Sequence, residues 1–100
     1  MVAFIKDIRK HLEVPDLPIV IGVAGHNGEA NEKQKKFRDA QAAPAGMDEF
    51  KGTVAAVQTA PFWDDTVKYD GGYHYKGSAR FYYSAGTAFG EAMLKLLKKD

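Results

Sequence analysis

Two short apolar runs, almost free of charge, most constrain the fold of this chain. Residues 19–24 read IVIGVA between Pro18 and Gly25, and residues 53–59 read TVAAVQT. A continuous apolar run bounded by turn residues is typical of a strand buried on both faces, so residues 19–24 are predicted to form a central parallel strand. Residues 31–43 have a helical pattern, and the order strand, helix, strand predicts a βαβ unit with a right-handed crossover. The expected fold class is α/β with a short parallel sheet.

Three amphipathic helices are predicted around this sheet. Residues 2–13 carry apolar side chains at helical spacing ahead of two prolines, and residues 31–43 begin with Asn31 and Gln34 spaced as in a capping box. A long C-terminal helix follows Ser78, whose hydroxyl is expected to accept a free N–H of the first turn. Its apolar stripe consists of Phe81, Ala85, Ala88, Phe89, Ala92, Met93 and Leu96.

The composition bounds the size of the domain and the class of partner. One hundred residues suffice for one small domain, and a net charge of +1 gives no reason to expect a nucleic-acid or membrane partner. The absence of cysteine excludes a disulfide framework and a thiolate zinc site, and it leaves the compartment open. No apolar run approaches the roughly 20 residues of a membrane-spanning helix, and the first residues do not have the pattern of a signal peptide.

A Gly- and Tyr-rich loop, residues 69–77, carries His74 just ahead of the long helix. An imidazole can take a proton from a serine hydroxyl near neutral pH and return it to a leaving group, so His74 is a candidate general base. Asp70 is a candidate for the acid that orients this histidine, with Asp64 and Asp65 as weaker candidates. The structural alternatives are a loop histidine bonded to backbone and packed between tyrosines, and a solvated turn aspartate.

A family resemblance adds to this interpretation of the loop. Residues 72–94, GYHYKGSARFYYSAGTAFGEAML, resemble the C-terminal end of the SGNH-type carbohydrate esterases, the group of sialate O-acetylesterases and acetylxylan esterases. Those proteins end in a His-aromatic-x-Gly-Ser-Ala run and a helix with a Gly-x-Ala-x-x-x-Ala-Met pattern. Residues 4–25, 37–43 and 54–64 look like the preceding helices and strands. The resemblance implies that residues 1–100 are a single partial domain, the C-terminal part of a three-layer, flavodoxin-like SGNH-hydrolase fold.

The same resemblance implies an activity and an incomplete site. His74 matches the family's catalytic histidine, which activates a serine for attack on an acetyl ester of a sugar. The family's acid stands three residues before that histidine, where this chain has Gly71, and Asp70 lies one residue earlier. The family's serine lies near the start of its domain, in a Gly-Gln-Ser-Asn-like turn that these residues do not contain. Ser78 and Ser84, the only serines, both fall in the predicted last helix.

These implications define the first functional hypothesis. The chain is expected to be the C-terminal segment of a serine-dependent carbohydrate acetylesterase, inactive alone and completed by the N-terminal portion of the domain. Its substrate in the intact enzyme would be an acetylated carbohydrate. Members of the family are often secreted or periplasmic.

Two further groups of side chains bear on ligand and metal binding. Trp63 and Tyr73 are candidate substrate-binding residues, because aromatic rings offer sugars flat apolar faces; the alternative is that they seat the loop on the core. His26 and Glu29 do not reach the three or four convergent ligands of a metal site, so neither a metal nor another cofactor is expected.

A second function class stays open. The chain could be a non-catalytic α/β module that binds a partner or itself. A sheet of only two strands has two exposed edges, and exposed edges pair readily with other chains.

Overall fold

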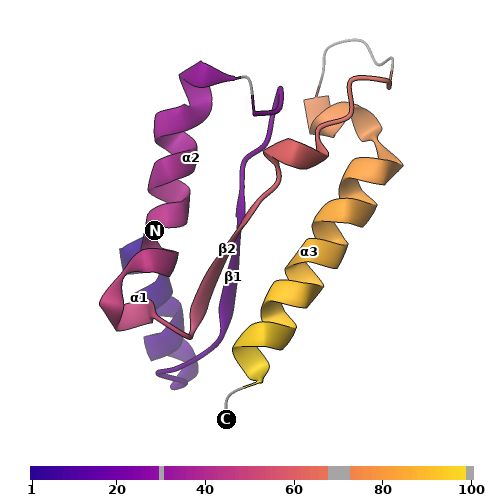
Figure 1. The fold of residues 1–100 in the computed structure, drawn as a ribbon. Helices are drawn as coiled ribbons and strands as arrows, with labels where there is room; N and C mark the ends of the chain where they lie inside the picture. The colour runs from indigo at the N-terminus through magenta and orange to yellow at the C-terminus, as the bar shows by residue number, and fades with distance from the viewer. Residues whose placement is uncertain (30, 68–72, 99–100) are drawn as a thin grey trace.

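The fold is known from a computed structural model that describes residues 1–29, 31–67 and 73–98 (Figure 1). It is a mixed α/β arrangement with a two-stranded parallel sheet and a long C-terminal helix. The helices and strands are α1 (Val2–Leu12), β1 (Ile19–Val23), α2 (Lys35–Ala42), β2 (Val54–Gln58) and α3 (Ala79–Leu97). The predicted strand, helix and strand of the βαβ unit are therefore confirmed.

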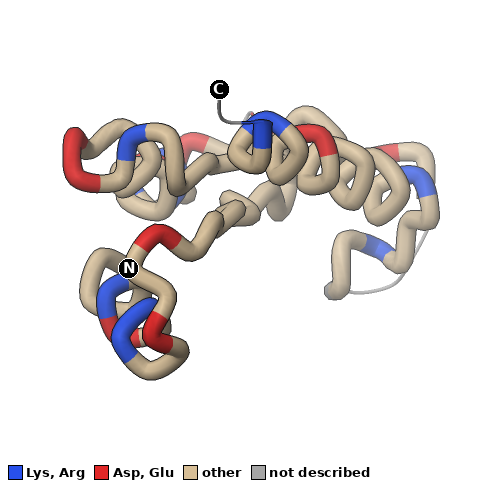
Figure 2. Tube along the Cα trace, turned by 90° about the horizontal axis from the view of Figure 1, so that it is seen from below, with Lys and Arg blue, Asp and Glu red and all other residues tan. Residues whose placement is uncertain are grey.

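The sheet register runs from Ile19 opposite Val54 to Val23 opposite Gln58. Helices cover both faces of this narrow sheet: α1 and α2 lie on one side and α3 on the other, as the views in Figures 1 and 2 agree. The main core cluster lies between α1 and the sheet and consists of Ile5, Ile21, Val23, Phe50 and Val54. Among the described residues, no helix has the length and apolar character needed to cross a membrane.

The predicted central position of β1 is not seen in the described part of the chain. There β1 has one neighbour, β2, and its other edge carries no strand. The apolar run of residues 19–24 reported correctly that helices cover both faces. Helices over both faces of a strand do not determine how many strands lie beside it. The apolar pattern therefore could not show that β1 has only one neighbouring strand in the described part of the chain.

The predicted capping box at the start of the second helix is wrong. The side-chain amide of Asn31 donates to the carbonyl of His26 at 3.1 Å and caps no helix. A single 3₁₀ turn, Glu32–Gln34, follows, and the α-helix begins at Lys35. The capping box does not form because the Asn31 side chain instead hydrogen-bonds to a carbonyl of the loop after β1.

The start of α3 is as predicted. The hydroxyl of Ser78 accepts the backbone N–H of Phe81 at 3.0 Å, which satisfies one free donor of the first turn. Phe81, Ala85 and Leu96 are buried along the predicted stripe, and the other stripe residues are half-buried. The apolar face of this helix therefore fixes the position of everything attached to its first turn.

The carboxyl ends of the two strands are clamped together. The hydroxyl of Thr59 donates to the carbonyl of Val23, and Gly25 packs directly against the backbone that follows β2. A Cβ on Gly25 would lie 2.5 Å from the Ala60 nitrogen, closer than real Cβ contacts occur. This close approach requires glycine.

Gly25→Ala is therefore expected to lower the free energy of unfolding by roughly 1–3 kcal/mol, because backbone atoms must move to admit the methyl group. The matched control is Gly90→Ala in α3, where an added Cβ meets no atom within 4 Å. That variant should raise the free energy of unfolding by about 0.5–1 kcal/mol through better helix propensity. Urea unfolding of both variants measures the difference, and equal effects of the two substitutions would contradict the packing described.

Candidate functional site

Three segments meet where the parallel strands end. They are residues 24–29 after β1, residues 59–66 after β2, and the turn Tyr73–Gly77 before α3. The N–H of Gly25 donates to the Tyr75 hydroxyl at 3.4 Å, which ties the first segment to the third. The crevice beyond the carboxyl ends of parallel strands is the usual ligand site in open α/β sheets. This junction is therefore the candidate site.

His74 lies in a left-handed turn of the backbone. Its φ is 52° and its ψ is 43°, and the next two residues, Tyr75 and Lys76, also have positive φ. A left-handed conformation costs a residue with a side chain roughly 1–2 kcal/mol, so three in succession need strong support from the surroundings. Strained backbone of this kind is concentrated at functional sites.

The support comes from aromatic side chains of the turn itself and of α3. The ring of Tyr75 stacks on Phe81 with centroids 3.9 Å apart and planes within 9°. The hydroxyl of Tyr82 donates to the carbonyl of His74 at 2.9 Å, and the N–H of Ser78 donates to the carbonyl of Tyr75 at 3.2 Å. The backbone at His74 is thus fixed to α3, while the His74 side chain is exposed.

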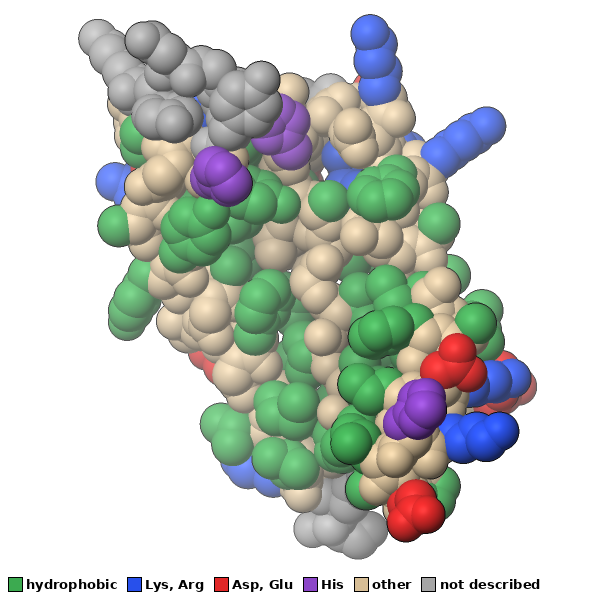
Figure 3. Space-filling model, turned by 180° about the vertical axis from the view of Figure 1, so that it is seen from behind, with side chains coloured by type: hydrophobic (Ala, Val, Ile, Leu, Met, Phe, Trp, Pro, Cys, Tyr) green, Lys and Arg blue, Asp and Glu red, His purple; other side chains and the backbone are tan. Residues whose placement is uncertain are grey.

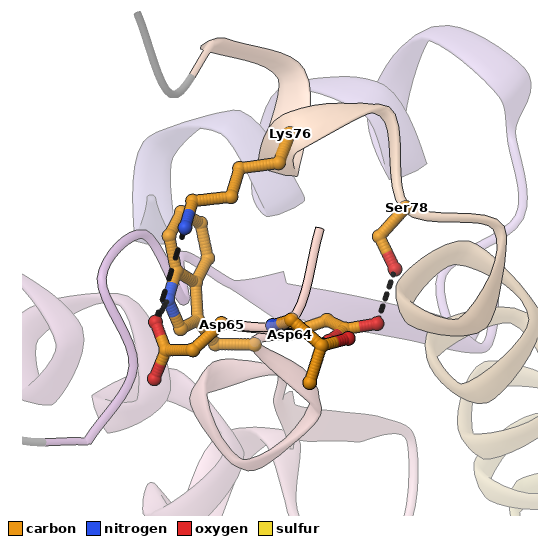
Figure 4. Close-up of polar contacts among 6 residues, drawn as sticks. Asp64, Asp65, Lys76 and Ser78 are labelled. Atoms are coloured by element: carbon orange, nitrogen blue, oxygen red, sulfur yellow. Dashed lines mark hydrogen bonds and ion pairs between the residues drawn. The ribbon is translucent and has the colours of Figure 1, made fainter. Parts of the chain in front are cut away.

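Ser78 is buried, and its hydroxyl both donates and accepts a hydrogen bond. It is only 2% exposed, it accepts from Phe81, and it donates to Oδ2 of Asp64 at 3.2 Å (Figure 4). A nucleophile needs a free, accessible oxygen beside its base. Ser78 therefore has a structural role at the start of α3, as the sequence indicated.

Asp64 is the acceptor for several neighbours. Its carboxylate receives the hydroxyl of Thr66, the backbone N–H of Thr66 at 2.9 Å and the hydroxyl of Ser78, and Nε of Arg80 lies 3.9 Å away. The Thr66 hydroxyl, then its N–H, and further Ser78 and Arg80 hold the pKa of the Asp64 carboxyl below its ordinary value. Burial acts in the opposite direction and is outweighed.

Trp63 is the centre of the junction. Its indole N–H donates to Oδ1 of Asp65 at 2.7 Å, and Nζ of Lys76 lies 5.3 Å from the ring centre and 4.0 Å from the same Asp65 oxygen (Figure 4). The ring of His26 meets Trp63 edge to face at 5.1 Å. The half-buried indole thus contacts all three segments, with its polar edge already bonded.

The structure describes some of the predicted site residues and not others. It brings the turn that carries His74 to the junction, where Trp63 lies. Asp70 lies outside the described residues, and so does the side chain of Tyr73, whose backbone begins the turn Tyr73–Gly77. The carboxylate of Asp64, a weaker candidate for the acid, has Thr66, Ser78 and Arg80 as its described partners. The roles of Asp70 and Tyr73 stay predictions.

Sequence reasoning missed the two side chains that flank Trp63. His26 is a candidate from the sequence only for a metal site, and Lys76 is not a candidate there, yet both contact the Trp63 ring. Their places in the sequence could have identified them, because both residues lie beside the ends of predicted elements. Within the described ranges, no group of three His, Asp or Glu side chains could hold a metal ion.

Comparisons of this chain with protein-family models, with curated proteins and with solved structures found no match. The family resemblance therefore rests on the sequence pattern alone.

The Asp64 network leads to a prediction about acid stability. A carboxyl whose pKa is lowered on folding stabilises the native state above its unfolded pKa, ordinarily 3.8, and this contribution is lost as the pH falls through the lower native pKa. Asp64→Asn should lower the urea midpoint at neutral pH, and its difference from wild type should shrink as the solution becomes more acidic than the ordinary aspartate pKa. Asp7→Asn, at an exposed position of α1, is the control and should move the midpoint little. A constant difference across that pH range would contradict the assignment.

Proposed function

We propose that this chain is the C-terminal segment of a serine-dependent carbohydrate acetylesterase and that it supplies the catalytic histidine, His74. The observation that carries the proposal is an exposed histidine on a strained, firmly supported turn at the carboxyl edge of a parallel sheet. The sequence block around this turn is the one that resembles the SGNH-type esterases. The sheet and its two helical layers are compatible with the C-terminal part of such a domain.

The chemistry assigned to His74 is general base and then general acid catalysis. Its imidazole takes the proton of a serine hydroxyl as the serine oxygen attacks the acetyl carbonyl. The imidazolium then gives this proton to the departing sugar oxygen, which leaves an acetyl-serine. Water, deprotonated by the same imidazole, attacks the acetyl-serine, and the imidazolium returns the proton to the departing serine oxygen as acetate is released. Asp70 is the proposed acid that holds the imidazole in the right tautomer.

The site around Trp63 is proposed to receive the sugar. Trp63 and Tyr73 are the proposed contacts, since an aromatic ring can cover the apolar face of a sugar. The indole N–H is occupied by Asp65, so the exposed part of the ring rather than its N–H would contact the ligand. No cofactor is needed for this chemistry, because the serine and the histidine carry all the bond changes.

The chain is proposed to be incomplete for this reaction. A triad acts as a unit, and without a serine and oxyanion donors an imidazole has no hydroxyl to activate. Ser78 does not fill this role, since its oxygen is buried and bonded to Asp64 and Phe81. The proposal therefore places the nucleophile in a polypeptide segment other than these 100 residues.

The purified chain should accordingly hydrolyse p-nitrophenyl acetate no faster than free imidazole at equal concentration. Coexpression with a Gly-x-Ser-bearing α/β segment, sought in the coding region upstream of Met1, should restore turnover. His74→Ala in the restored enzyme should lower kcat by at least about 10³-fold, in the range seen when one member of a triad is removed.

The control is His11→Ala on α1, which should leave the rate of the restored enzyme unchanged. The proposal fails if no such upstream segment exists, or if the restored rate does not depend on His74. A rate of the chain alone that is lost in both His74→Ala and Ser78→Ala would also overturn it, because the nucleophile would then be Ser78.

A further inference from the structure

The chain exposes more surface than a complete monomer of its mass. A folded monomer of 11.0 kDa is expected to expose about 5,600 Å², whereas this chain exposes 7008 Å². The radius of gyration is 15.0 Å, against about 13 Å for a compact chain of this length. The excess of about 1,400 Å² exceeds the roughly 800 Å² that each partner buries in a standard interface. An area of this size is enough for a stable dimer.

Part of that surface is the free edge of β1. The N–H of Ile19 donates to the Thr53 carbonyl at 2.9 Å, so Ile19 and every second residue after it are directed toward β2. Val20 and Gly22 direct their N–H and C=O groups to the opposite edge. Within the described ranges of the chain, no strand lies on that edge. Such an edge is a template for pairing with another strand.

Hydrophobic side chains accompany this edge. The edge is turned toward the far side of Figure 1, which Figure 3 shows, and hydrophobic side chains gather over the middle and lower part of that face. Large apolar side chains are exposed on both flanking helices, with Phe4 61% and Leu12 56% exposed on α1, and Leu94 and Leu97 similarly exposed on α3. With a net charge of +1, two copies of the chain repel each other weakly.

We propose that the free edge of β1 pairs antiparallel with the same edge of a second copy, about a two-fold axis at Ile21. In this register Val20 of each copy lies opposite Gly22 of the other, and each such pair exchanges two hydrogen bonds. Four strands then form one continuous sheet. The proposal concerns the assembly of this chain by itself and does not rest on the esterase chemistry of His74. An N-terminal segment that adds strands to β1 would compete with the second copy for the same edge.

The register follows from the donors available at the edge. Pro18 has no N–H, and the N–H of Ala24 already donates to Oε1 of Gln41 at 2.9 Å. An axis at Ile21 pairs every N–H and C=O of Val20 and Gly22. Moving the axis to Val20 pairs Gly22 with Pro18 and leaves the Gly22 carbonyl without a donor. Moving it to Gly22 pairs Val20 with Ala24 and leaves the Val20 carbonyl without one.

The side chains fit the same register. A Cβ on Gly22 would lie 2.7 Å from the ring of Phe89, so Gly22 and Val20 face α3. A cavity of about 180 Å³ beside Gly22 is lined by Phe89, Tyr82 and other apolar groups. The Val20 side chain of the second copy comes to lie over this space. The two-fold axis also keeps α1 of both copies on one face of the sheet.

Sedimentation equilibrium tests the proposal on the full chain, which should sediment as a dimer of twice 11.0 kDa. Val20→Pro removes an N–H from the proposed interface and should give the monomer mass. Ala56→Pro is the matched control, because the N–H of Ala56 lies on the outer edge of β2, and it should remain dimeric. A monomeric wild-type chain, or a dimer lost only in Ala56→Pro, would overturn the proposal. Circular dichroism establishes that each variant is folded.

A cysteine cross-link tests the register and does not depend on the proline variants. The chain has no cysteine, so Ile21→Cys introduces a single thiol. An axis at Ile21 places the two copies of this residue about 4.5 Å apart between Cα atoms, within the range for a disulfide. Mild oxidation should give a covalent dimer. Ala56→Cys, at the position paired with Ile21 inside one chain, should not cross-link. Absence of the Ile21→Cys cross-link in a folded variant would refute the register.

Discussion

The candidate site depends on the two hydrogen bonds made by the buried hydroxyl of Ser78. By accepting the Phe81 N–H it fixes where α3 begins, and by donating to Asp64 it holds the segment after β2 against that point. The start of α3 determines where Phe81 presents its ring to Tyr75. The stacked Tyr75 in turn supports the left-handed turn that carries His74. One oxygen atom thus connects the helix, the loop and the histidine.

The pattern of apolar residues was sufficient to predict the architecture. The runs at residues 19–24 and 53–59 became β1 and β2 in parallel register, and the stripe after Ser78 became α3. These predictions succeeded because burial on a strand or helix face is a local, periodic property of the sequence. The capping role of Ser78 was also predictable, since it depends on a donor only three residues away.

The geometry of the site was not predictable in the same way. The left-handed turn at His74 involves residues with side chains, for which local preference favours negative φ, so only tertiary contacts can explain it. The bond from Ser78 to Asp64 joins residues 14 apart, and the contact between His26 and Trp63 joins different loops. The use of Asn31 in a loop rather than a cap was decided by its neighbour His26. Each outcome depends on how segments meet in space.

The position of Trp63 has a consequence for observing this protein in solution. It is the only tryptophan of the chain, and it lies between the Lys76 ammonium, the His26 ring and the Asp65 carboxylate. The emission of an indole responds to the charges around it. The intrinsic fluorescence therefore follows the closeness of the three loops, so the protein carries its own optical probe at the junction of those loops.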